Sequence, residues 1–183
     1  MTIFSDRGPA HRLRSQSMVE FALILPIMML LLATLFELGR YIIIKQTAVN
    51  LTRETGMLAV RRVDGTTATN FPNVMAAASL IATPVNLTND GRIYVAQISR
   101  RQSDNQPIIV QYGALGNLPA KAKVLTAGLG GVATLPASVA LQSNQVMYVV
   151  ETYLRFVPVM QFGFVNLVPV TGESNCVYDT AYF

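Results

Sequence analysis

The longest apolar stretch of the chain lies near its N-terminus and has an acid at each end. No charged side chain occurs from Phe21 to Phe36, where the sequence reads FALILPIMMLLLATLF. Glu20 directly precedes this stretch and Glu37 directly follows it. A helix needs about 20 apolar residues to cross a bilayer core, and charged side chains at its ends can extend toward the interface. The pattern therefore predicts a membrane-inserted helix in which Glu20 needs a partner, since an acid in such a segment indicates a functional role by default.

Residues 1–15 precede this helix and form a short basic leader that contains Gly8, Pro9 and three arginines. A secretory signal peptide begins in the same way, but it ends in a small-x-small cleavage site after its apolar core. The sequence after Phe36 shows no such site, so we expect the apolar stretch to be retained as an anchor. Arg7, Arg12 and Arg14 favour a cytoplasmic N-terminus under the positive-inside rule.

The helical pattern continues beyond the apolar stretch, because no proline occurs from Glu37 to Arg62. Glu37 and Arg40 have the i, i+3 spacing of a helical ion pair. We predict one helix from about Gln16 to about Arg62, roughly 70 Å long at 1.5 Å per residue, with its first half in lipid and its second half on a folded domain. Pro26 predicts a kink, because it removes a backbone hydrogen bond and clashes with the preceding turn. Small residues for packing against another element recur at Ala48, Leu51, Thr52, Thr55 and Ala59.

Beyond Arg62 the periodicity changes from helical to alternating. We predict strands at 92–100, 107–112, 145–157 and 177–183, with a hairpin loop at 103–105 and short helices at 73–81 and near 120–127. In the strongest strand, 145–157, Tyr148 and Val150 share one face while Val149 and Glu151 share the other. The sum is an α+β fold, in which a long N-terminal membrane-anchored helix packs on a small antiparallel sheet. Its three parts are a leader (1–15), the helix (16–62) and an extracytoplasmic α+β domain (63–183).

Composition narrows the classes of function. The 14 Lys and Arg residues are scattered, which argues against nucleic-acid binding. The single histidine, His11, lies in the leader, and Cys176 is the single cysteine, so catalysis by a histidine-activated nucleophile and a Cys/His metal site are excluded from the body of the chain. The glycines at 128–131 lack the strand–helix context of a phosphate-binding loop. We therefore expect neither an enzyme nor a cofactor.

The sequence around the start of the apolar stretch resembles the start of TadE-like proteins, the minor pilins or pseudopilins of the bacterial tight-adherence (Tad) pilus system. The matching residues run from Arg14 to Pro26 and read RSQSMVEFALILP. Residues 36–40, FELGR, are similar to the E-F-G-R of the family. The strand from Tyr148 to Pro158 and the ending VYDTAYF are also similar, but less specifically. The specific resemblance covers about a quarter of the chain.

The resemblance implies a type IV prepilin-like precursor with a pilin-like fold. A prepilin peptidase would cut between Ser15 and Gln16, which leaves Glu20 as the fifth residue of the mature chain. The family usually has glycine before the cut, where this chain has Ser15. Glu20 and Phe21 would then serve processing and assembly. The implied partners are the peptidase, other pilin or minor pilin subunits, the inner-membrane assembly platform and membrane lipid.

Two alternatives remain open at this point. The chain is either a processed minor pilin or an uncleaved single-pass anchor whose outer domain binds a partner in a secretion or assembly complex. Glu20 either pairs with an amine or simply marks the water-facing membrane interface. The N-terminus of the mature protein separates the first two interpretations.

Overall fold

The computed structural model describes residues 10–61, 71–83, 85–142, 145–159 and 176–183, with side chains from Met18 onward. The chain divides into two compact units, residues 1–40 with 158–167 and residues 41–157 with 168–183. We describe each unit by itself.

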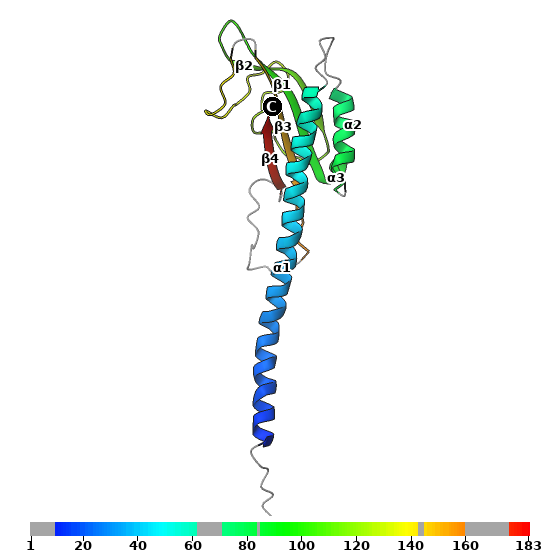
Figure 1. Cartoon of the computed structure of the whole chain (residues 1–183), viewed down its shortest axis with the longest axis vertical. Coiled ribbons are helices and arrows are strands. Elements are labelled where there is room, and N and C mark those ends of the chain that lie inside the picture. The colour runs from blue at the N-terminus through cyan, green and yellow to red at the C-terminus, as the bar shows by residue number, and fades with distance from the viewer. Residues whose placement is uncertain (1–9, 62–70, 84, 143–144, 160–175) are drawn as a thin grey trace, which may run out of the picture. The chain divides into compact units, whose positions relative to one another are not determined.

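The first helix, α1, spans Ala10–Arg61 and contributes to both units (Figure 1). It begins six residues before the predicted start at Gln16, so the helix includes the last part of the predicted leader. Its observed end is one residue before the predicted end. Pro26 lies inside α1, which continues on both sides of it; the kink there stays a prediction.

The second unit contains a four-stranded antiparallel sheet. Its strands are β1 (Gly91–Arg100), β2 (Pro107–Leu115), β3 (Val146–Arg155) and β4 (Cys176–Tyr182), in the order β2-β1-β3-β4. Each overlaps one predicted strand, so the α+β fold with an antiparallel sheet is confirmed. The hairpin between β1 and β2 places Asn105 at φ 58°, a conformation that asparagine tolerates better than most residues.

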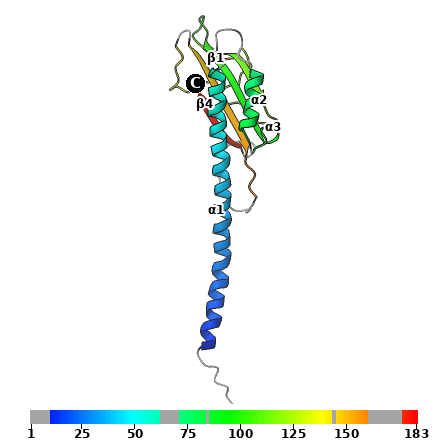
Figure 2. The same cartoon turned by 45° about the vertical axis from the view of Figure 1, so that its right-hand side comes forward.

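Helices cover one face of this sheet (Figure 2). The second half of α1 and the helix α2 (Phe71–Ile81) bury their apolar side chains there, together with the one-turn helix α3 (Leu87–Asp90). Pro72 lies in the first turn of α2, where a missing N–H costs no helical hydrogen bond, so this helix begins earlier than predicted. The predicted stripe of small residues on α1 is fully buried in this layer. Its members are Ala48, Leu51, Thr52, Thr55 and Ala59.

The other face of the sheet is covered by the segment that joins β2 to β3. Its buried side chains include Leu118, Val124 and Leu125, which pack against Val149 and Tyr153 of β3. This coverage explains why β3 is buried on both faces from Tyr148 to Leu154.

The short helix predicted near Ala120–Ala127 is wrong, because the segment forms bends and turns. The backbone N–H groups of Lys123 and Val124 donate to the Glu151 carboxylate of β3. The Val124 carbonyl accepts a hydrogen bond from the Thr134 N–H. The backbone N–H and C=O groups that would form hydrogen bonds within a helix are therefore bonded to other parts of the unit instead.

Candidate assembly site on the first helix

The first half of α1 displays an exposed apolar surface. Glu20 is exposed at the start of the apolar stretch, and Phe21 beside it is 66% exposed. Among the described residues, one helix is long and apolar enough to cross a membrane, and it is the part of α1 from Met18 onward. The large apolar side chains that it exposes include Leu23, Ile27, Met29, Leu32 and Leu35. An exposed continuous apolar surface of this length indicates a membrane anchor.

Ser15 and Gln16, the predicted cleavage residues, lie in the backbone of α1, and their side chains are outside the described residues. Gln16 and Glu20 are four residues apart on a continuous helix. They therefore share one face and are separated by about 6 Å along the axis. The structure places this face at the N-terminal end of the apolar stretch.

Glu37 ends the apolar stretch and is buried, with 4% of its surface exposed. Arg40 Nη1 lies 3.4 Å from its carboxylate, which confirms the predicted i, i+3 pair. The backbone N–H of Val159 donates to Glu37 Oε1 at 2.7 Å. A charge-assisted hydrogen bond of this length is among the stronger kinds in proteins. Glu37 therefore ties the segment that follows β3 to the helix, a contact that the sequence did not predict because Val159 is 122 residues away.

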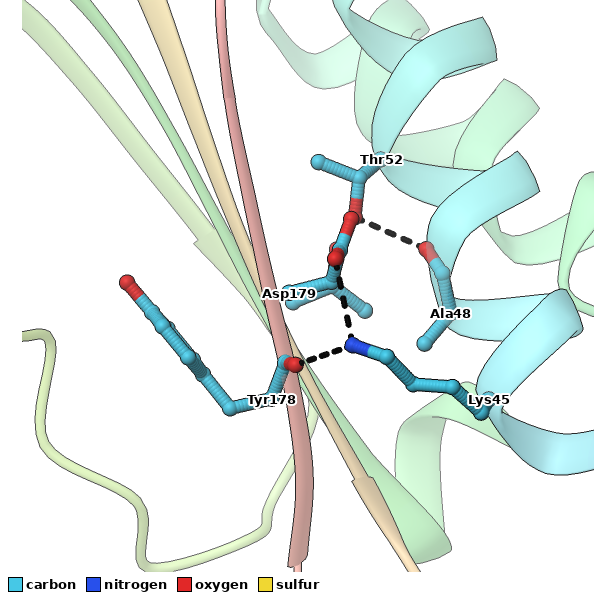
Figure 3. Close-up of polar contacts among 6 residues, drawn as sticks. Lys45, Ala48, Thr52, Tyr178 and Asp179 are labelled. Carbon is cyan, nitrogen blue, oxygen red and sulfur yellow. Dashed lines mark hydrogen bonds and ion pairs between the residues drawn. The ribbon is translucent and has the colours of Figure 1, made fainter. Parts of the chain in front are cut away.

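A second polar contact joins α1 to β4 within the sheet-bearing unit (Figure 3). Lys45 Nζ donates to the Tyr178 carbonyl at 2.8 Å and lies 3.2 Å from Asp179 Oδ1. The carbonyl of an edge strand is thereby satisfied by a side chain, and Asp179 compensates the positive charge. This contact fixes α1 against the outer strand of the sheet.

Two threonines, Thr52 of α1 and Thr152 of β3, form a hydrogen bond across the helix–sheet interface. Thr52 Oγ1 lies 2.8 Å from the Ala48 carbonyl and 2.9 Å from Thr152 Oγ1, and both threonines are fully buried. A hydroxyl carries one proton, so Thr52 donates to Ala48 while it accepts from Thr152. The pair satisfies two buried hydroxyls at a close approach of helix and sheet, which fixes their register.

Glu151 of β3 is, with Glu37, one of two buried acids among the described residues, and the sequence alone did not predict its partners. Its carboxylate accepts hydrogen bonds from the N–H of Val124 at 2.6 Å, from the N–H of Lys123 and from the Tyr178 hydroxyl. Burial raises the pKa of Glu151, while these hydrogen bonds act in the opposite direction. Burial and the neighbouring Glu151 charge also raise the pKa of Tyr153 and Tyr178. The sequence signal for this site was a single acid in a mostly apolar predicted strand. Such a signal does not identify which distant groups bind the carboxylate.

The described residues hold no group of three or more His, Cys, Asp and Glu side chains that could bind a metal ion. The features that stand out on α1 are therefore its exposed apolar surface, the acid at its start and the polar contacts that hold its second half. Residues 16–56 match the family model of the TadE-like proteins. The resemblance seen in the sequence is confirmed over this segment. No curated protein and no solved structure matches the chain.

The TadE-like match begins at Gln16 and ends at Gly56, so it covers less than a quarter of the chain. It includes Glu20, the exposed apolar surface and the Glu37 contact. The strands and the loop around Glu151 lie outside it. The match indicates a protein that is associated with the Tad pilus and its components and that carries an N-terminal apolar helix.

Proposed function

We propose that the chain is a structural minor pilin, or pseudopilin, of a Tad-type type IV pilus. The observation that carries this proposal is the TadE-like segment that begins at Gln16 and presents an exposed apolar helix with Glu20 at its start. A prepilin peptidase removes residues 1–15 by cutting between Ser15 and Gln16. The mature subunit then takes part in pilus assembly and adherence as a structural component without catalytic activity.

Assembly uses the new N-terminus and Glu20 together. Cleavage gives Gln16 an α-ammonium group one helical turn from the Glu20 carboxylate, so the two charges lie on one face. In an apolar bundle, the carboxylate pairs with this amine or with the amine of a neighbouring subunit. Removing one partner from a buried ion pair costs about 3–5 kcal/mol, because it leaves the other charge uncompensated. Glu20 thereby favours subunits that are processed and correctly aligned, and Phe21 beside it packs in the same contact.

The orientation of the anchor follows from the charges at its ends. Arg7, Arg12 and Arg14 keep the N-terminus on the cytoplasmic side of the inner membrane, where the peptidase acts, and the sheet-bearing unit lies outside the cytoplasm. The partners in this position are the peptidase, other pilin subunits, the assembly platform and lipid. Reporter fusions at Phe183 test this topology, and a signal from a cytoplasm-only reporter contradicts it.

Processing is tested by the intact mass of the protein extracted from membranes of cells that contain the pilus system. The expected species has lost residues 1–15 and begins at Gln16, which leaves 168 of the 183 residues. Ser15→Gly should speed cleavage, because it restores the family's usual residue before the cut. Ser15→Leu should block cleavage by its bulk. A mature protein that still begins at Met1 in the assembled form overturns the processing step.

The role of Glu20 is tested separately, by the amount of the chain that copurifies with pilus subunits. Glu20→Ala should remain inserted, since removal of an acid favours burial in lipid, but its assembly should fall. Glu20→Gln keeps the shape and should behave like Glu20→Ala if the charge matters. Glu54→Gln is the matched control, because it removes another exposed acid from the same helix. Normal assembly of both Glu20 variants contradicts the proposed pairing.

One observation favours a second candidate, an uncleaved single-pass anchor whose outer unit binds a partner in an assembly complex. Ser15 stands where the family usually has glycine, and the bond after it lies within α1 in the full-length chain. This candidate predicts an intact N-terminus together with assembly that does not depend on Glu20. The mass measurement and the Glu20 variants therefore distinguish the two functions.

A further inference from the structure

The charge-free part of α1 is too short to span a bilayer by itself. It runs from Phe21 to Phe36, and these 16 residues extend over roughly 24 Å at 1.5 Å per residue. The hydrocarbon core of a typical bilayer is about 30 Å thick, and a tilted helix needs a longer stretch still. About four further residues must therefore enter the core, either before Phe21 or after Phe36.

The two possible extensions differ in the acid that they bring into lipid. An extension before Phe21 includes Glu20, whose side chain is exposed. An extension after Phe36 includes Glu37, of which only 4% is exposed. Transfer of a carboxylate from water into lipid is costly because the group loses its hydration, and a carboxylate that the protein has already buried has less hydration to lose. Before assembly with other subunits, the extension after Phe36 is therefore the less costly one.

The charge of Glu37 is balanced within the protein. Arg40 Nη1 lies 3.4 Å from the carboxylate, and the Val159 N–H donates to Oε1 at 2.7 Å. Ionisable groups inside membranes usually pair with one another or with the backbone. The Arg40 side chain is partly exposed and long enough to extend toward the headgroups. Leu38 is exposed, so the surface of α1 continues to offer an apolar side chain beyond Glu37.

Val159 lies at the level of Glu37 along α1, because its backbone is bonded to the Glu37 carboxylate. Its apolar side chain is 66% exposed. Both residues belong to the compact unit of residues 1–40 and 158–167. The sequence has no charged residue between Arg155 and Glu173, so no charge next to Val159 in the chain opposes contact with lipid. An exposed valine therefore lies beside the exposed apolar surface of α1, at the end of the charge-free stretch.

We propose that the boundary of the bilayer core lies beyond Glu37, at about Arg40, and that Val159 contacts lipid there. The proposal rests on the membrane anchor of the proposed function and adds a second lipid contact from a residue that follows β3. The occupant is lipid because the Val159 side chain continues the apolar surface that the anchor already presents to the bilayer. Glu37 holds Val159 at this depth, while Arg40 balances the charge of the carboxylate.

The test measures the depth of single positions with tryptophan, which the natural chain lacks. The full chain with Val159→Trp is purified and reconstituted in phosphatidylcholine vesicles, with bromine on the lipid chains either near the headgroups or near the bilayer centre. We expect bromine near the headgroups to lower the tryptophan fluorescence at least about twofold, because the side chain lies at the edge of the hydrocarbon core. Bromine near the centre should quench it less.

Two control variants define the scale of the measurement. Met29→Trp lies in the middle of the charge-free stretch, so bromine near the bilayer centre should quench it most. Val110→Trp replaces another exposed valine, which lies in β2 of the sheet-bearing unit, and bromine at either place should leave it unquenched.

Glu37 variants test what holds Val159 at this depth. In the Val159→Trp chain, Glu37→Gln keeps a side-chain oxygen that accepts the backbone N–H of residue 159, so the quenching should persist. Glu37→Ala removes the acceptor, and the quenching should fall toward the level of Val110→Trp. Equal quenching in the two Glu37 variants overturns the role of Glu37 in this contact.

The quenchers distinguish lipid from the other surroundings of position 159. A Val159→Trp chain that is quenched by iodide in the water and not by brominated lipid overturns the proposal. Protection from both quenchers indicates a protein contact and also overturns it. None of these readouts depends on cleavage after Ser15 or on Glu20. If Met29→Trp is quenched and Val159→Trp is not, the lipid contact alone fails; if neither is quenched, the anchor fails and both proposals fail with it.

Discussion

Replacing Glu151 tests whether a buried carboxylate holds the β2–β3 segment on the sheet. In Glu151→Leu, the N–H groups of Lys123 and Val124 and the hydroxyl of Tyr178 lose their acceptor. Val124 is buried, so its N–H would be left without an acceptor, which costs about 1–3 kcal/mol of folding stability. Lys123 is exposed, so its N–H can form a hydrogen bond to water instead. The losses at the other two donors are smaller, so we expect Glu151→Leu to lower the free energy of unfolding by roughly 2–4 kcal/mol in total. This is a large part of the roughly 5–15 kcal/mol that is typical of a folded domain.

Glu151→Gln is the matched variant, because it keeps one acceptor and removes the charge. In the wild type, Oε1 receives all three donors, at 2.6 Å from Val124 and 3.2 Å from both Lys123 and Tyr178. A glutamine carbonyl in this place retains them, while its amide group stands near the Lys123 N–H, where Oε2 was. We expect a change within about 1 kcal/mol at neutral pH, since the loss of one bond is offset by relief of the buried charge.

The pH dependence of stability separates these two effects. Burial raises the pKa of Glu151 in the folded protein above its unfolded value, so the folded protein binds this proton more tightly. The Glu151 contribution is therefore most favourable below the unfolded pKa and decreases as the pH rises through the window up to the folded pKa. As the pH rises from the unfolded pKa of Glu151 toward its raised pKa in the folded protein, the wild type should lose stability relative to Glu151→Gln.

The assay is urea unfolding of the full chain in detergent micelles, followed by near-ultraviolet circular dichroism of its tyrosines. The chain has seven tyrosines and no tryptophan, and four of the tyrosines lie in a cluster near Glu151. Equal stability of Glu151→Leu and Glu151→Gln would refute the acceptor role. A difference between the wild type and Glu151→Gln that does not change with pH would refute the influence of burial on this pKa.

Three further predictions concern the attachment of α1 to the sheet. Lys45→Met should lower the stability by about 1 kcal/mol, because the partly exposed ion pair with Asp179 and the hydrogen bond to the Tyr178 carbonyl each contribute only a part of this amount. Thermal unfolding at low and at high salt separates the two contributions, since salt screens only the ion pair. Gly56→Ala places a methyl group 2.0 Å from a ring atom of Phe183, so it should destabilise the protein by about 1–3 kcal/mol. In a Phe183→Ala background the same change should be neutral or stabilising, and a double-mutant cycle measures this difference. A chain that starts at 66 lacks the buried helix stripe and should aggregate, whereas one that starts at Glu37 should be soluble; a cooperative, monomeric unfolding transition of the shorter chain would contradict this packing.

The sequence determined the elements whose signal is local. The charge-free stretch from Phe21 to Phe36 predicted the anchor, because membrane insertion depends on composition over one continuous segment. The small-residue stripe on α1 predicted a buried helix face, since helical periodicity places its members together whatever their partner is. Alternation predicted the four strands, and the i, i+3 spacing predicted the contact of Glu37 with Arg40. The segment near 120–127 was misread, because its helix-like composition is overruled by bonds to a strand.

Only the tertiary structure decided which distant residues meet. The Val159 N–H reaches Glu37 across 122 residues, and Lys45 pairs with Asp179 across 134. The strand order β2-β1-β3-β4 likewise depends on pairings that no single strand encodes. Periodicity specifies which face of an element is apolar, but many pairings bury the same faces. Their choice depends on the satisfaction of buried polar groups in the assembled fold, where each unpaired donor costs about 1–3 kcal/mol.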